Sequence, residues 1–148
     1  MKIAFVRYCL AILVCVSAPI SGINDGAASA MGLKEARHLI QAGSPERAIG
    51  LLETYIHDHK DSAEAYDLLG FAHISVGQLE AAAMSYDAAL IVDPEYLSAL
   101  EHQGELYLLM SQPKFAERNL MKLERLCRCE CNEYELLAER VRDYHRHK

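Results

Sequence analysis

The sequence predicts an all-α fold in which pairs of helices stack into an α-solenoid. Two observations lead to this class. Apolar residues recur at the i, i+3, i+4, i+7 spacing of amphipathic helices along most of the chain. The same arrangement of large and small residues also returns every 34 residues. A repeated helix pair buries its apolar face against its neighbours, so this period predicts a stack rather than a closed bundle.

The first thirty residues have a different character. Lys2 and Arg7 precede a short apolar run, and a small, polar stretch follows that ends in a small-x-small sequence at Ala30. This order is typical of a secretory signal peptide, so we predict cleavage after Ala30 and a domain over residues 31–148. The protein is then expected to be periplasmic or secreted, without membrane contact after cleavage. An uncleaved N-terminal anchor is the alternative.

The clearest repeat unit covers residues 63–96. Its large residues are spaced to fill the gap between helix pairs, its small residues to let two helices approach closely, and Gly77 to form the turn. These positions are held by Tyr66, Leu69, Gly70, Gly77, Ala82, Tyr86, Ala89, Leu90 and Pro94. The pattern returns in units over about residues 29–62 and 97–130. A fourth step gives one further helix, about 132–146, which we expect to cap the stack.

This pattern resembles the tetratricopeptide repeat (TPR) at nearly every signature position of the middle unit. The resemblance implies a right-handed α-solenoid of three TPR helix hairpins plus a C-terminal capping helix. It also implies a protein-binding role, because helical repeat proteins present a concave face to their partners.

Seven helices are expected, and local chemistry supports their ends. We place a proline at the first position of three of them (Pro45, Pro94 and Pro113) and a capping-box-like start at Asn132 with Glu135. The predicted ranges are 31–43, 45–58, 62–76, 78–91, 95–110, 113–126 and 132–146.

Composition excludes several functions. The chain has 148 residues, 51% hydrophobic and 24% charged, with 15 Lys+Arg against 21 Asp+Glu and a net charge of -6. Binding to nucleic acid relies on a basic face, so no nucleic-acid partner is expected. The longest apolar run, Tyr8–Ile20, is too short for a membrane-spanning helix. The sequence has no phosphate-binding glycine loop, Gly-x-Ser-x-Gly or His-Glu-x-x-His motif, so we expect neither an enzyme nor a cofactor.

The resemblance also implies which residues face the groove, because the first helix of each TPR pair lines it. The candidate partner-binding residues are Leu33, Arg37, Glu64, Asp67, Phe71, Ile74, Glu101, Glu105, Leu108 and Leu109. Four carboxylates and one arginine border an apolar floor. We therefore expect a protein or peptide partner that carries basic and apolar residues. The alternative is that the acids form an ordinary solvated face.

One known TPR function is not expected here. Chaperone-binding members hold a C-terminal carboxylate with Lys, Asn and Arg side chains from three repeats. The matching positions of this chain carry Leu33, Arg37, Leu68, Ser98 and His102. Only Arg37 has a suitable charge, so the carboxylate clamp is absent.

Three cysteines, Cys127, Cys129 and Cys131, fall in the expected turn before the cap. Cys127 and Cys131 are the disulfide candidates, since a turn brings such Cα atoms within the roughly 4.4–6.8 Å that a disulfide needs. Their surroundings are similar to a Cys-pair tail in small exported bacterial TPR proteins. The alternative is a thiol or metal-binding module built on the three cysteines. His145 would lie about 20 Å along the cap helix from Cys131 and is not an expected ligand.

Overall fold

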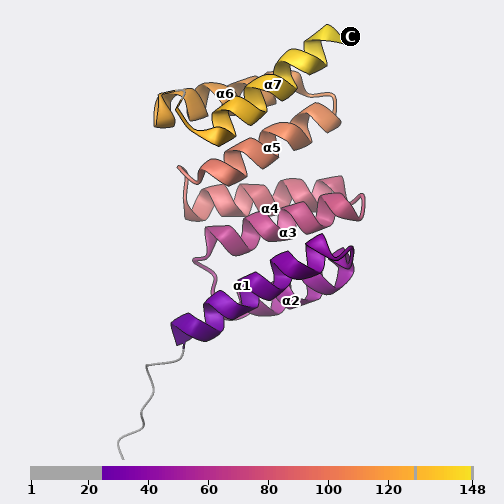
Figure 1. Cartoon of the computed structure of the whole chain (residues 1–148), viewed down its shortest axis with the longest axis vertical. Coiled ribbons are helices and arrows are strands. Elements are labelled where there is room, and N and C mark those ends of the chain that lie inside the picture. The colour runs from indigo at the N-terminus through magenta and orange to yellow at the C-terminus, as the bar shows by residue number, and fades with distance from the viewer. Residues whose placement is uncertain (1–24, 129, 148) are drawn as a thin grey trace, which may run out of the picture.

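The computed structural model describes residues 25–128 and 130–147, and this part of the chain forms seven helices and no strand. The helices are α1 (Asp25–Gln41), α2 (Pro45–Asp58), α3 (Ala63–Ser75), α4 (Leu79–Val92), α5 (Leu97–Leu109), α6 (Pro113–Cys127) and α7 (Asn132–Arg146). Figure 1 shows three hairpins, α1–α2, α3–α4 and α5–α6, stacked along the long axis, with α7 packed over the end of the stack. The predicted all-α class and the order of helices are confirmed.

The first helix begins earlier than predicted. Helix α1 starts at Asp25 instead of near residue 31 and runs through Ala30, whereas the other helices lie within two residues of their predicted ends. Alanine is the strongest helix former, and three alanines between residues 27 and 30 explain the extension. The predicted signal peptide lies mostly outside the described residues, so its cleavage stays a prediction.

Proline positions are only partly as expected. Pro45 and Pro113 are the first residues of α2 and α6. Pro94 instead lies in the turn before α5, where the Asp93 side chain accepts a hydrogen bond from the backbone N–H of Glu95 (2.9 Å). A side chain that bonds the backbone two residues on stabilises a turn in place of the first helical turn.

The last helix begins at the predicted residue but is capped differently. Asn132 is the first residue of α7, and the capping position belongs to Cys131, which makes no side-chain cap bond. The predicted capping box at Asn132 is therefore wrong. Ser62, by contrast, caps α3 by accepting a hydrogen bond from the backbone N–H of Ala65 (3.2 Å).

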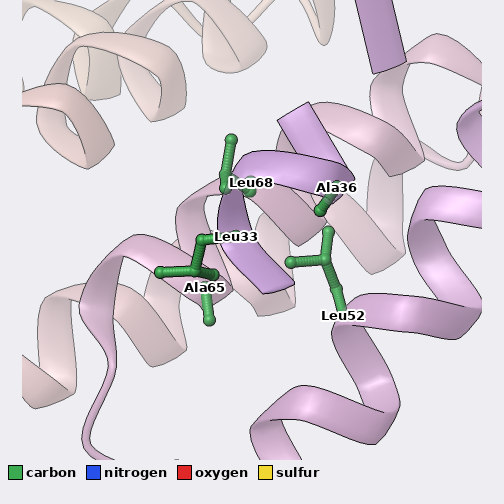
Figure 2. Close-up of a cluster of buried hydrophobic side chains, with 5 residues drawn as sticks. All are labelled: Leu33, Ala36, Leu52, Ala65 and Leu68. Atoms are coloured by element: carbon green, nitrogen blue, oxygen red, sulfur yellow. The ribbon is translucent and has the colours of Figure 1, made fainter. Parts of the chain in front are cut away.

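The apolar core is divided along the stack. At the N-terminal end, residues from α1, α2 and α3 pack together, as Figure 2 shows for Leu33, Ala36, Leu52, Ala65 and Leu68. At the other end, α5, α6 and α7 meet around Leu100, Ala116, Leu123, Leu137 and Val141. Each cluster joins one hairpin to the next helix of the stack, which is how a repeat array gains stability. No helix in residues 25–128 or 130–147 is long and apolar enough to cross a membrane.

Two glycines permit close contacts between helices. A Cβ atom on Gly70 would lie 2.6 Å from the Tyr86 ring, inside the α3–α4 hairpin. A Cβ atom on Gly104 would lie 2.5 Å from the end of the Leu137 side chain, which comes from α7. Gly70 and Gly104 are 34 residues apart and so occupy the same position of the repeat. In the middle hairpin this glycine makes room for the Tyr86 ring, and in the third unit it makes room for Leu137 of the cap helix.

Candidate binding groove

The predicted groove residues all come from α1, α3 and α5, the first helices of the three hairpins. These helices contact one another in succession, and α5 contacts α7 in the same way. Helix α7 thus continues the row as a fourth member. The row α1, α3, α5 and α7 is called the inner row below.

The apolar candidates differ in exposure. Phe71 is 42% exposed and Leu109 is 62% exposed, and Ile74 and Leu108 are half-buried. Leu33 is buried in the core between α1, α2 and α3. Its predicted place in the groove is wrong, because α2 and α3 bury this side chain and leave it only 8% exposed.

Two of the acidic candidates form ion pairs between neighbouring inner helices. The guanidinium of Arg37 on α1 bonds the carboxylate of Glu64 on α3. The Nε–H of Arg140 on α7 donates to Oε1 of Glu105 on α5 at 2.8 Å. Both acids are partly exposed, yet each already has a cation from this chain beside it. Glu64 and Glu105 therefore belong to ion pairs, a pairing that the sequence did not predict.

The other two acids are buried. Asp67 on α3 and Glu101 on α5 are each only 5% exposed. His102 lies between them, with its Nδ1 atom 2.8 Å from Oδ1 of Asp67 and its Nε2 atom 3.2 Å from Oε2 of Glu101. The expectation that these acids border an open groove is wrong, because the contact between α3 and α5 encloses them. We refer to Asp67, Glu101 and His102 as the acid–histidine cluster.

Aromatic rings enclose the acid–histidine cluster. The ring centroid of His102 lies 5.6 Å from that of Phe71 and 6.0 Å from that of Tyr86. The Tyr86 hydroxyl is buried and has no hydrogen-bond partner among the described residues. Phe71 therefore has one face on the cluster and remains partly open to solvent. The cluster supports the floor of the groove at the middle of the stack.

Burial and charge shift the titration of this cluster. Burial raises the pKa of Glu101 from 4.5 to about 7, although the charge of His102 opposes the shift. Burial alone lowers the pKa of His102, but the hydrogen bond and the charge of Asp67 outweigh it and raise the pKa above 6.5. Burial also raises the pKa of Tyr86, and the nearby carboxylates add to that effect. The tyrosine is therefore neutral at physiological pH.

The role of His102 was not predicted from the sequence. The residue was considered only as a failed position of the carboxylate clamp. A signal was nevertheless present: His102 follows Glu101 directly and comes 35 residues after Asp67, about one repeat length. That spacing places a histidine next to two acids on adjacent inner helices.

A pocket of about 600 Å³ opens between α5 and α7. Three predicted residues, Glu105, Leu108 and Leu109, form its α5 wall. The α7 wall was not predicted, and it consists of Arg140, Asp143, Tyr144 and His147. The fourth step of the repeat was the available signal, because a further first helix faces the same side as the others.

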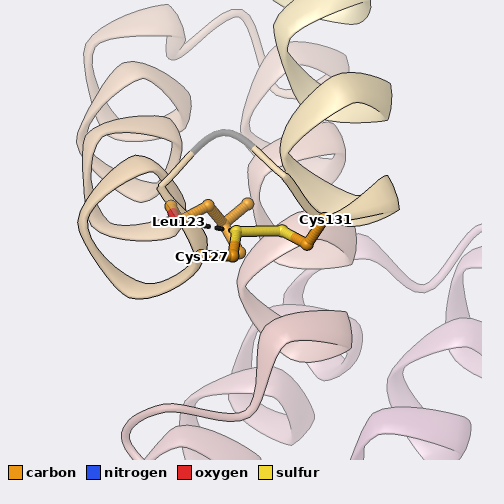
Figure 3. The surroundings of a disulfide bond; sticks show 3 residues. All are labelled: Leu123, Cys127 and Cys131. Carbon is orange, nitrogen blue, oxygen red and sulfur yellow. Dashed lines mark hydrogen bonds between the residues drawn. A yellow bond between two sulfur atoms is a disulfide. The ribbon is translucent and has the colours of Figure 1, made fainter.

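The cysteine turn lies at the end of the stack, between α6 and α7 (Figure 3). The Cα atoms of Cys127 and Cys131 are 5.6 Å apart and their Sγ atoms 2.07 Å apart, which corresponds to a disulfide. Cys129 lies outside the described residues. Across residues 25–128 and 130–147, no group of three or more His, Cys, Asp or Glu side chains is arranged to hold a metal ion. The oxidation state of these cysteines in the cell stays a prediction.

Comparisons with known proteins give the fold. No protein-family model matches the sequence, and no curated protein matches it either. Among solved structures, the first TPR domain of Spaghetti (RPAP3), bound to an HSP90 peptide, has a TM-score of 0.73 at 13% identity over 83% of this chain and 97% of its own. The Yersinia enterocolitica type III secretion chaperone SycD, in complex with a peptide of the translocator YopD, has a TM-score of 0.70 at 20% identity over 82% and 92%.

The Sgt2 TPR domain from Aspergillus fumigatus gives a similar result, with a TM-score of 0.72 at 19% identity over 80% of each chain. The chain therefore has the α-solenoid fold of TPR domains, as the repeat pattern predicted.

Proposed function

We propose that this protein is a non-enzymatic scaffold that holds a segment of a protein partner against its inner row. The observation that carries the proposal is the exposure of Phe71 and Leu109 on that row, at 42% and 62%. A contiguous exposed apolar patch with polar residues around it marks a binding surface, and large apolar side chains anchor most interfaces. The pocket between α5 and α7 adds a concave site at one end of the same surface.

The similar structures support a peptide ligand. SycD was solved with a peptide of YopD, and the first TPR domain of RPAP3 with an HSP90 peptide. This chain lacks the residues of the carboxylate clamp, so we do not propose the same mode of recognition as for chaperone C-termini. We propose instead that apolar side chains of the partner provide most of the binding energy, because buried apolar anchors dominate most interfaces.

The pairing of the acids changes the predicted charge preference. A carboxylate that already faces Arg37, His102 or Arg140 attracts a second cation weakly, since the field of the pair falls off faster than that of a single charge. Basic residues of the partner are therefore proposed to affect the association rate modestly and to contribute little to the lifetime of the complex.

The scaffold is also proposed to work outside the cytoplasm, in the periplasm or after secretion. The support is the N-terminal sequence, in which Lys2 and Arg7 precede a short apolar run and a small-x-small sequence ends at Ala30. Removal of residues 1–30 would shorten α1 but keep its core residues Leu33, Ala36 and Leu39. We expect N-terminal sequencing of the protein from the cell envelope to begin at Met31. Recovery of an intact Met1 would favour a membrane anchor instead.

The experiment for the groove is partner capture followed by kinetics. The exported protein is used to isolate its partner from the cell envelope, and dissociation is then compared for Phe71→Ala, Leu109→Ala and Ile91→Ala. The two groove variants are expected to dissociate about tenfold faster, because each loses buried apolar area in the complex. Ile91 is the matched control, since it is 81% exposed but lies on α4, outside the inner row. Unchanged dissociation of both groove variants would contradict the proposal.

The cysteine alternative is tested in the same measurement. A variant with Ser at Cys127, Cys129 and Cys131 is expected to bind the partner as the wild type does. If this variant stays folded and loses the partner while the groove variants keep it, the cysteine turn is the binding site. The intact mass of the exported protein reports the oxidation state, because each disulfide removes two hydrogen atoms.

A further inference from the structure

The pocket between α5 and α7 has an apolar floor and a charged rim. Leu108, Leu109 and the ring of Tyr144 provide the apolar part. Leu108 also packs on the core cluster of α5, α6 and α7, so the floor is firmly supported. Leu109 projects from this floor with 62% of its surface exposed. The apolar surface is therefore continuous with the core below and open above.

The acids of the rim are paired within the chain. Oε1 of Glu105 accepts a hydrogen bond from Nε of Arg140 at 2.8 Å, across the gap between α5 and α7. Oδ1 of Asp143 lies 3.3 Å from Nη1 of Arg146 on the same helix. The remaining titratable residues of the lining are Tyr144 and His147. Each acid of the rim therefore has a cation of this chain beside it, so neither offers an unpaired carboxylate to a second cation.

We propose that this pocket binds a bulky, uncharged apolar side chain of the partner segment, and that Arg140 determines this specificity by neutralising Glu105. The inference rests on the proposed function, because it assigns one side chain of the bound segment to one subsite. Charge complementarity identifies the occupant. A rim of ion-paired acids above an apolar floor matches an uncharged apolar side chain better than a lysine or a glutamate.

The physical reason is desolvation. A lysine ammonium that entered the pocket would lose water and would find Glu105 already bonded to Arg140. An apolar side chain loses no such hydration and gains contact with Leu108, Leu109 and Tyr144. Arg140 is 63% exposed, so its replacement removes the pairing charge without disturbing the core. Loss of Arg140 would leave Glu105 as an unpaired acid beside an apolar floor, which is a site for a basic side chain.

The test uses peptides as probes. A random dodecapeptide library displayed on phage is selected against the exported protein. The best peptide is then scanned with alanine against the wild type and against Leu109→Ala. The apolar peptide residue whose contribution disappears in Leu109→Ala is assigned to the pocket. A second peptide carries Lys at that residue. The wild-type protein is expected to bind the apolar peptide at least about tenfold more tightly than the Lys peptide. Arg140→Gln is expected to raise affinity for the Lys peptide about threefold, more at low salt.

Two further variants are the controls. Arg142→Gln makes the same change in charge on the same helix, but Arg142 does not line this pocket, so it should leave both affinities unchanged. The double variant Glu105→Gln/Arg140→Gln should lose the gain for the Lys peptide, because the carboxylate that would attract lysine is gone. Thermal unfolding of each variant verifies that the fold is retained.

The outcomes separate this inference from the proposed function. Equal peptide preferences in Arg140→Gln and wild type would overturn the role of Arg140. Peptides whose binding needs Phe71 but not Leu109 would overturn the pocket and leave the groove function standing. If binding of no selected peptide depended on Phe71 or Leu109, both proposals would fail.

Discussion

Helix α5 packs against α3 on one side and against α7 on the other. These two helix–helix interfaces, called the α3–α5 and α5–α7 joints below, are built differently. At the α3–α5 joint, Glu101 is 5% exposed and bonds His102, which also bonds Asp67. At the α5–α7 joint, Glu105 lies one turn further along α5, is 33% exposed, and pairs with the mostly exposed Arg140. Two glutamates on the same face of one helix therefore have different surroundings, and the neighbouring helix determines which is buried.

The two joints also differ in how apolar their contacts are. The α5–α7 joint has Leu137 against Gly104 and a cluster that includes Leu100 and Val141. At the α3–α5 joint, the acid–histidine cluster lies beside the rings of Phe71 on α3 and Tyr86 on α4. An apolar joint tolerates an open pocket beside it, whereas a buried polar joint requires every partner to stay in place. We therefore expect the two joints to respond differently to substitution.

The largest effect is expected from overpacking the close glycine contacts. Gly70→Leu would force a side chain into the Tyr86 ring, which is held by α4 and cannot move aside, and should lower the free energy of unfolding by about 1–3 kcal/mol or more. Gly104→Leu should also lower the free energy of unfolding, because the contacting Leu137 side chain is fully buried in the core. Gly50→Leu is the control, since nothing lies within 4 Å of its Cβ position. Chemical denaturation measures all three, and equal losses at Gly70 and Gly50 would contradict the helix contacts described here.

The fold was predictable because it depends on spacing. The positions of Gly70, Gly77 and Tyr86 within a 34-residue period define the hairpin and its turn without further information. Phe71 lies on α3 and Leu108 and Leu109 lie on α5, while their role in binding stays a prediction. Helix packing follows the period of side chains along the chain, and the sequence contains that period directly.

The charges of the groove were harder to predict, because pairing depends on which side chains meet between helices. Arg37 and Glu64 were both identified from the sequence, but their contact was not. Arg140 was not identified at all, since α7 was considered only as a cap. A carboxylate has the same sequence signature whether it is solvated, ion-paired or buried. Only the geometry of the neighbouring helix distinguishes these states.

A matched pair of substitutions compares the two joints directly. Asp67→Asn removes the charge that faces His102 inside the α3–α5 joint and should lower the free energy of unfolding by about 1–3 kcal/mol, as for a buried charged hydrogen bond. Glu105→Gln makes the equivalent change at the exposed α5–α7 joint and should cost about 0.2–1 kcal/mol. Urea denaturation at neutral pH gives both values. A larger loss for Glu105→Gln would reverse the assignment of the polar and apolar joints.

The most specific effect is the pH dependence of the α3–α5 joint. Burial raises the pKa of Glu101 from 4.5 to about 7, so the folded protein holds this proton more tightly than the unfolded chain does. The stability from this proton is complete below about pH 4.5 and is lost as the pH rises through about 7. The pKa of His102 is also raised above 6.5, since Asp67 outweighs the opposing effect of burial, and its contribution is lost as the pH rises through that raised value.

Both groups therefore make the folded protein less stable as the pH rises, by at most about 1.4 kcal/mol per pH unit for each proton. The charged and titratable groups that act on them are Asp67 on α3, Tyr86 on α4, Glu105 on α5 and Glu133 on α7. Glu101→Gln should flatten the decline between about pH 4.5 and 7, because glutamine imitates the protonated acid and does not titrate. His102→Gln should flatten the decline that begins above pH 6.5. Urea denaturation across this range measures the difference from wild type, and parallel curves for Glu101→Gln and wild type would show that Glu101 does not titrate within the joint.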